Sequence, residues 1–261
     1  ITGVSSTLEA PQPSSAVVNF STDLNNWRNT FYWDKLRMKL APGDYLKAHR
    51  YHWLHANADT TSGILESEVP PLEGRIFYNY PGQTQPPIYQ GTLAFPSTVA
   101  RVVKDAAGNN QTQATKYEYN AQGNVTKKID PVGRETKTDY STDGIDVVAI
   151  KQRTGTSGGS PVYTTTTTFA YAPGTPPHRP SSVTDGAGQT TSYTYTATGQ
   201  VQTIQNPKGE VTTFTYETST SSAAYGRVLS ITGDVPGGNR SFTYDTFGRL
   251  LTSTDSEGYA L

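Results

Sequence analysis

The sequence contains no cysteine, only one methionine and four histidines, and no long apolar run. Without cysteine the chain forms no disulfide and has no thiolate nucleophile. No window approaches the roughly 18 continuous apolar residues of a membrane-spanning helix, so we predict no spanning segment. The formal net charge is only −1, which gives no electrostatic basis for binding nucleic acid or an acidic membrane surface.

Apolar residues make up only 34% of the 261 residues, which is low for a packed globule. Tyrosine alone occurs 17 times, however, and threonine is frequent. Both are strand-forming residues with polar tips. The composition therefore predicts extended sheets with much of their surface in water, in one large β domain or two smaller ones.

The clearest local pattern lies in residues 241–258, SFTYDTFGRLLTSTDSEG. Phe242 and Tyr244 are two positions apart, so they share a face of an extended strand. The tetrapeptide that starts at Asp245 has Asp first and Gly fourth, which is the preference of a type I turn. The tetrapeptide that starts at Asp255 repeats this chemistry. The pattern predicts strand, turn, strand, turn.

Much of the chain repeats this hairpin. Tyr119 and Tyr140 are 21 residues apart, and so are Tyr195 and Tyr216. Half-copies of the second turn begin at Asp105 and Asp185. We predict structural roles, not chemical ones, for the residues that define the repeat. These residues are Tyr117, Tyr119, Gly123, Asp130, Gly133, Tyr193, Tyr195, Gly199, Asn206, Gly209, Phe242, Tyr244, Asp245, Gly248, Arg249, Asp255 and Gly258.

Aromatic residues recur in pairs separated by one residue. Eight such pairs occur, where random placement at 11% aromatic content would give roughly three. In stacked hairpins they would lie beside one another on neighbouring strands, and each contact would contribute roughly 0.2–1 kcal/mol. This would stabilise a thin sheet. The pairs are 31/33, 51/53, 78/80, 117/119, 169/171, 193/195, 214/216 and 242/244.

We divide the chain into residues 1–97, an irregular β region continuous with the array, and residues 98–261, the repeat array. Short strands are expected at 1–4 and 16–20. In the segment 25–39 the alternation of Leu36, Met38 and Leu40 with basic residues favours strands over a helix. Two Gly/Ser/Thr-rich inserts, 153–162 and 219–225, are expected to be surface loops.

The Tyr-Asp-x-x-Gly-Arg motif of residues 244–249, the repeat period and the Asp-Pro-x-Gly turn at Asp130 resemble the YD repeats of the RHS (rearrangement hotspot) family. Some copies replace the Asp, as Asn120 and Thr196 do. Residues 52–83 also resemble a segment found upstream of YD repeats in bacterial RHS proteins. The resemblance covers about residues 98–261. It is specific, because the turn, the aromatic pair and the repeat period all agree.

The resemblance implies β-strands wound into a curved, spiralling shell wall. It implies a secreted or cell-surface bacterial scaffold, often enclosing a C-terminal toxin domain; the related teneurins use a similar shell in cell adhesion. Because repeat arrays expose edge strands, we also expect this chain to continue in a longer parent chain, or further copies to pair with it edge to edge.

His49, His52 and His55 form the only set that suggests a metal site. In a strand, His49 and His55 would share one face about 20 Å apart, and His52 would face the other side, so we predict ordinary polar roles and no metal site. The repeated turn aspartates suggest calcium, but the EF-hand and GGxGxD patterns are absent. We therefore assign them to turn capping.

Glu66, Glu68 and Glu73 suggest a paired-carboxylate glycosidase, but nothing in the sequence places two of them across a cleft. For Arg134, Arg227 and Arg249, stacking on a neighbouring tyrosine is the expected role. The sequence thus predicts a structural, non-catalytic shell segment without cofactors. The alternative is a cell-surface adhesin or carbohydrate-binding repeat module that recognises polysaccharide through exposed aromatic residues.

Overall fold

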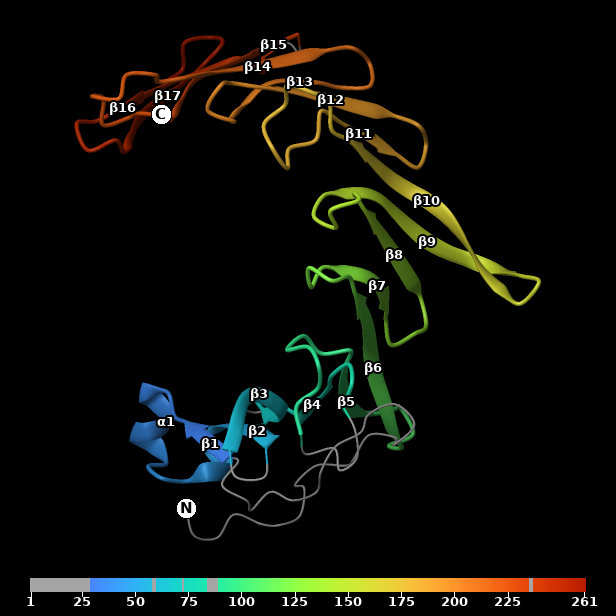
Figure 1. The fold of residues 1–261 in the computed structure, drawn as a ribbon. Coiled ribbons are helices and arrows are strands. Elements are labelled where there is room, and N and C mark those ends of the chain that lie inside the picture. The colour runs from blue at the N-terminus through green and yellow to red at the C-terminus, as the bar shows by residue number, and fades with distance from the viewer. Residues whose placement is uncertain (1–28, 58–59, 72, 84–88, 235–236) are drawn as a thin grey trace. The chain divides into compact units, whose positions relative to one another are not determined.

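A computed structural model describes residues 29–57, 60–71, 73–83, 89–234 and 237–261. In this part of the chain there are 17 β-strands, one α-helix and one 3-10 helix (Figure 1). Every register pair between strands is antiparallel, and each joins strands that follow one another along the chain. The predicted all-β class of stacked antiparallel hairpins is confirmed. The strands expected at 1–4 and 16–20 lie outside the described residues.

The chain divides into two compact units, Ile1–Lys137 and Thr138–Leu261. The first contains a ladder in which each strand pairs with the next, from β1 to the start of β8. Its elements are β1 (Asn29–Tyr32), α1 (Lys35–Leu40), a 3-10 helix (Tyr45–Lys47), β2 (His49–Asn57), β3 (Thr60–Val69), β4 (Ile76–Asn79), β5 (Thr98–Lys104), β6 (Asn110–Tyr119), β7 (Val125–Ile129) and β8 (Glu135–Tyr140).

The second unit continues the same architecture, with sequential pairing from β9 to β17. Its strands are β9 (Val147–Ser157), β10 (Ser160–Ala170), β11 (Ser182–Asp185), β12 (Thr190–Tyr195), β13 (Val201–Gln205), β14 (Val211–Tyr216), β15 (Val228–Gly233), β16 (Arg240–Tyr244) and β17 (Leu250–Asp255).

Register gives the sheet of the second unit two chemically different faces. Tyr193 lies opposite Ile204, and one residue further along, Thr194 lies opposite Thr203. Successive side chains of a strand point to opposite faces, so aromatic and aliphatic residues collect on one face and hydroxyl residues on the other. Across strands the hydroxyls bond to each other, as Thr194 and Thr203 do at 2.6 Å.

The buried apolar core is small and lies mostly in the first unit. Leu54 and Phe77, from β2 and β4, are 0% and 1% exposed. Among the described residues of the second unit, the buried apolar residues are Ala149 and Ala224. The composition pointed to a thin, wetted sheet, and the second unit has that character.

The segment 25–39 was predicted to form strands, and this is wrong in part. β1 does form, but residues 35–40 make a helix. Asp34 caps it, because its Oδ1 accepts the backbone N–H of Arg37 at 2.8 Å. The alternating Leu36, Met38 and Leu40 are not buried by it; they are 47–73% exposed.

The loop expected at 153–162 is also wrong, because β9 and β10 run through it as paired strands up to a turn at residues 158–159. The insert at 219–225 does contain no strand, as predicted. The proposed division after residue 97 stays a prediction. Across that point β4 pairs with β5, with Phe77 opposite Ala100.

Candidate functional site

Eight turns in the described residues share one hydrogen-bond pattern. In the turn at Asp245, the amide of Gly248 donates to the Asp245 carbonyl at 2.9 Å, and the Asp245 amide donates to the Arg249 carbonyl at 2.9 Å. The turn glycines have φ between +72° and +88°, as a type I turn followed by a left-handed residue requires. The eight turns begin at Asp105, Asn120, Asp130, Asp185, Thr196, Asn206, Asp245 and Asp255.

The side chain of the first turn residue accepts hydrogen bonds from backbone N–H groups of the same turn. Asp245 Oδ1 accepts the backbone N–H groups of Phe247 and Arg249, both at 2.9 Å. Asn120 makes the same two bonds, at 3.0 and 2.9 Å, so the Asp-to-Asn replacement preserves the cap. Thr196 Oγ1 accepts from the Gln200 amide at 3.1 Å. The turn therefore needs a side-chain oxygen at this position, not a charge.

The capping hydrogen bonds also explain why the pKa values of these turn aspartates are lowered. The backbone amide of Arg249 is the largest of the influences that hold the pKa of Asp245 below its usual value. The amide of Asn109 does the same for the pKa of Asp105. A carboxylate stabilised in its charged form by fixed N–H donors suits a structural cap and is a poor general acid.

The turns at the two ends of the hairpins have different surroundings. In the turns that follow an aromatic pair, the glycine is packed against neighbouring residues. A Cβ added to Gly248 would lie 2.3 Å from the Ala223 carbonyl oxygen, and a Cβ added to Gly123 would lie 2.7 Å from the Phe95 ring. At the opposite end, a Cβ on Gly133 or Gly209 would meet no atom within 4 Å. One edge of the repeats is packed and the other is open.

In five of the aromatic pairs the second residue is a tyrosine that joins neighbouring strands at the packed edge. Tyr244, at the end of β16, donates its hydroxyl to the carbonyl of Val228, at the start of β15, at 2.7 Å. Burial raises the pKa of Tyr195 and Tyr216, which make the same contact. The five bonds of this kind are Tyr119 to Pro96, Tyr171 to Val147, Tyr195 to Pro180, Tyr216 to Val201 and Tyr244 to Val228, at 2.6–3.0 Å.

The predicted arginine stacking is found in part. Arg227 lies over the ring of Tyr244 at 5.6 Å, as expected. Arg249 instead lies over Phe247 at 5.1 Å and donates from Nε to Asp245 at 2.7 Å. Arg134 donates from Nε to Asp130 at 2.6 Å. Both turn arginines are about three-quarters exposed, so these ion pairs contribute little to stability.

A buried polar cluster in β2 and β3 was not anticipated from the sequence. His52 Nε2 lies 3.1 Å from Glu66 Oε2, and both side chains are only 2% exposed. The pair depends on a β-bulge: Ser67 is opposite His52 and Leu65 is opposite Trp53, so Glu66 has no register partner. A bulge redirects a side chain, which places this carboxylate against the imidazole.

The other two histidines have partners of their own. His49 Nε2 lies 2.7 Å from Glu68 Oε2, and Tyr78 donates its hydroxyl to Glu68 Oε1 at 2.6 Å. His55 Nδ1 lies 3.0 Å from the Asn57 carbonyl. In the described part of the chain no three His, Cys, Asp or Glu side chains are grouped to hold a metal ion. Glu66, a candidate glycosidase carboxylate, is inaccessible to substrate.

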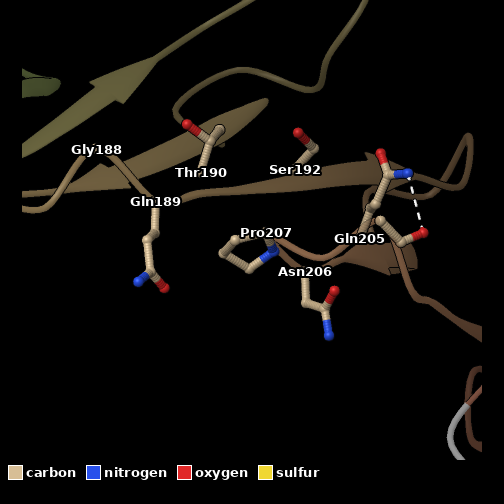
Figure 2. Close-up of a pocket in the computed structure, with 8 residues that line it drawn as sticks. Gly188, Gln189, Thr190, Ser192, Gln205, Asn206 and Pro207 are labelled. Atoms are coloured by element: carbon tan, nitrogen blue, oxygen red, sulfur yellow. Dashed lines mark hydrogen bonds between the residues drawn. The ribbon is translucent and has the colours of Figure 1, made fainter.

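The open edge carries a polar hollow of about 470 Å³ between the turns after β11 and β13. None of its lining side chains is charged. Figure 2 shows Thr190 and Ser192 pointing to one side of the hairpins and Gln189 and Asn206 to the other. Because these groups do not converge, the hollow contains no catalytic arrangement.

A protein-family model for the RHS repeat matches residues 178–211. The matched segment contains Tyr193, Tyr195, Gly199 and Gly209, and so spans an aromatic pair and both kinds of turn. Residues 178–211 are thus similar to one RHS repeat. The predicted resemblance is confirmed.

A solved structure of a toxin complex has a similar fold. The Photorhabdus luminescens Tc holotoxin pore structure aligns at a TM-score of 0.51 with 13% identity, covering 81% of this chain. A TcdB2–TccC3 structure without its hypervariable C-terminal region aligns at 0.42 with 13% identity over 87%. The chain spans only 12% and 10% of those chains. The search of curated proteins found no match.

These findings support a structural RHS scaffold. In the described residues, no helix has the length and apolar character to span a bilayer. The tyrosine hydroxyl acceptors and the His52–Glu66 pair are the contacts that sequence reasoning missed. A Tyr-x-Tyr pattern gives no acceptor, and a bulge leaves no local signature, so neither could have been found from sequence.

Proposed function

We propose that this chain is a non-catalytic segment of the wall of a bacterial RHS shell, which is secreted or presented at the cell surface and encloses a C-terminal toxin domain. The observation that carries the proposal is the tyrosine contact that five strands, β6, β10, β12, β14 and β16, make with the preceding strand or with a residue just before it. Because this contact joins only neighbours, hairpins can be added without limit, which suits a wall.

The chemistry of the described residues supports a non-catalytic role. The turn aspartates are held by backbone N–H donors, as at Asp245. Glu66 is buried against His52, and Glu68 is shared by His49 and Tyr78. Each carboxylate thus has a structural use. In this proposal the partners of the chain are neighbouring repeats of a longer parent chain, and the enclosed domain.

The toxin part of the proposal rests on analogy. The solved structure of similar fold is that of the Photorhabdus luminescens Tc holotoxin pore, a toxin complex. The parent gene tests it: an enclosed toxin requires an RHS core motif and then a variable domain beyond residue 261. A gene that continues without either would refute toxin enclosure and leave the wall intact.

Small-angle scattering of the 261-residue chain tests the wall itself. A compact globule of this length has a radius of gyration of about 18 Å. A wall segment of stacked hairpins gives a clearly larger value, with negative-stain images of a curved strip. A radius of gyration near the globular value would exclude the wall.

The alternative is a polysaccharide-binding adhesin. Against it, the repeat tyrosines use their hydroxyls on backbone carbonyls, as Tyr244 does on Val228. Exposed aromatic residues remain, such as Phe247 and Tyr259, at 77% and 73% exposure. A glycan array decides between the two: saturable binding to a neutral or acidic glycan supports the adhesin, and its absence supports the wall.

A further inference from the structure

The connection between β1 and β2, residues 33–48, forms a small lobe of its own. Tyr32 lies opposite His49 in the register of these two strands, so the lobe begins and ends at one place. Trp33 closes it, because its Nε1 donates to the Asp44 carbonyl at 3.0 Å. Figure 1 shows α1, which belongs to the lobe, beside β1 in the first unit.

Large apolar side chains of the lobe face water. Leu36, Leu40 and Leu46 are 63%, 73% and 54% exposed, and Met38 is 47% exposed. No residue of α1 is buried. Single exposed apolar residues are normal on a protein surface, but four within a span of 11 residues mark a surface that makes a contact.

The same lobe carries an excess of positive charge. Its two acidic residues, Asp34 and Asp44, accept the backbone N–H groups of Arg37 and Leu46 at 2.8 and 3.0 Å. Its three lysines are exposed, and none of them forms an ion pair with a described residue. The net charge of −1 belongs to the whole chain and hides this local excess. The four cations of the lobe are Lys35, Arg37, Lys39 and Lys47.

The helix places the two kinds of side chain next to each other. Leu36 and Leu40 are four residues apart, so they form one apolar stripe along α1. At 3.6 residues per turn, Lys39 lies on one side of this stripe and Arg37 on the other. An apolar stripe between cations with long aliphatic stems is typical of segments at a membrane interface, because the stems reach the headgroups while the apolar residues enter the boundary below.

We propose that the 33–48 lobe docks on the surface of a bilayer that contains anionic phospholipid. Leu36 and Leu40 enter the headgroup boundary, and the lysines lie against lipid phosphates. The lobe lies on the bilayer and does not cross it. The inference is independent of the shell, since it needs only the exposed leucines and cations of the lobe.

A bilayer is the partner that uses both features of the lobe. A soluble polyanion would pair with the lysines but leave the leucines in water. A partner protein that binds a helix in a groove needs several apolar anchors along it, and α1 has only six residues and one pair of leucines on a stripe.

Flotation of the 261-residue chain with lipid vesicles tests the proposal. The chain should bind vesicles of phosphatidylcholine mixed with phosphatidylglycerol, and added salt should weaken this binding because it screens exposed charges. Vesicles of phosphatidylcholine alone should bind much less protein. Lys35→Gln/Lys39→Gln should weaken binding to the anionic vesicles by about 30-fold, the factor expected for two lysines near an anionic surface. Leu36→Ser/Leu40→Ser should abolish it.

Matched controls make the same changes elsewhere. Leu250→Ser/Leu251→Ser alters two leucines of β17 that are 58% and 63% exposed, and Lys128→Gln/Lys208→Gln alters two exposed lysines. Both should bind as the wild type does, and circular dichroism verifies that each variant folds. Because the chain has no cysteine, Leu40→Cys accepts a single environment-sensitive fluorophore, whose emission should shift to the blue on anionic vesicles.

Three results would overturn the proposal. The first is a wild type that does not bind anionic vesicles. The second is an equal loss of binding in the lobe variants and in the controls, which would mean a general attraction of the protein surface. The third is binding to heparin that matches the binding to anionic vesicles and survives Leu36→Ser/Leu40→Ser, which would assign the lobe to soluble polyanions.

Discussion

At the scale of single residues, all turn glycines have a positive φ, but some are packed against neighbouring residues and others face open space. Gly248 and Gly209 both have positive φ, so alanine costs about 1–2 kcal/mol at either site. At Gly248 the added Cβ also meets the Ala223 carbonyl oxygen, whereas at Gly209 it meets open space. We therefore expect Gly248→Ala to lower the urea midpoint clearly more than Gly209→Ala does.

Substitution of the glycines by asparagine separates the cost of positive φ from the cost of the Cβ contact. Asparagine tolerates positive φ better than alanine, so Gly209→Asn should recover most of the loss at the open site. Gly248→Asn should recover little, because the contact with the Ala223 carbonyl remains. Equal midpoints for the two alanine variants would show that the packed edge yields to the added atom.

Buried Tyr80 and half-buried Tyr78, both in the first unit, predict sensitivity to alkali. Burial is the main reason that the pKa values of Tyr78 and Tyr80 are raised above the usual range. Their hydroxyls donate to Glu68 and to the Leu65 carbonyl at 2.6 and 2.7 Å. A folded pKa above the unfolded value of about 10 means that the stabilisation is complete below pH 10.

This stabilisation is lost as the pH rises from about 10 through the folded pKa values, because the unfolded chain then releases protons that the folded chain keeps. The urea midpoint of the wild type should therefore fall more steeply above pH 10 than that of Tyr78→Phe/Tyr80→Phe, while absorbance near 295 nm reports phenolate formation. Parallel curves for the two proteins would contradict the prediction.

At the scale of elements, the bulge in β3 has an energetic consequence. It holds Glu66 against His52, with both side chains 2% exposed. Glu66→Ala leaves a buried imidazole without its carboxylate, which typically costs about 3–5 kcal/mol. Glu118→Ala is the matched control in the same unit, because Glu118 pairs with Lys127 but is 60% exposed. It should cost no more than about 1 kcal/mol.

Chemical denaturation of the two variants measures the difference. Equal small losses would mean that His52 is held as a neutral side chain by its bond to Asn29, which is 2.8 Å from Nδ1. A loss confined to Glu66→Ala supports the pair as an anchor between β2 and β3. The result bears on the first unit alone.

The same elements show what sequence can predict. Asp or Asn first and Gly fourth predict a turn because both preferences act within four residues, and the Asp245 turn has the expected bonds. The helix at 35–40 was missed because its alternating apolar residues suggested a buried strand face, while the Asp34 cap decided the structure. The His52–Glu66 contact joins residues through a bulge, which depends on pairing between strands and not on local preference.

At the scale of the whole molecule, the two units differ in how much they bury. Leu54, Phe77 and the His52–Glu66 pair give the first unit a closed core, whereas the described apolar side chains buried in the second are alanines. In a repeat array each element is stabilised mainly by its neighbours. Protection against hydrogen exchange should therefore be highest in β2, β3 and β4 and lower across β11 to β17.

Phe77→Ala tests how far one loss of core packing spreads. Phe77 is 1% exposed, so its truncation should cost about 3–5 kcal/mol. Hydrogen exchange with mass spectrometry should show faster exchange in β3, β4 and β5, the strand of Phe77 and its register partners. Exchange in β12 to β17 should be unchanged, because none of these strands pairs with that region. Faster exchange throughout the chain would mean that the array unfolds as one cooperative body, which contradicts stability built from neighbouring hairpins.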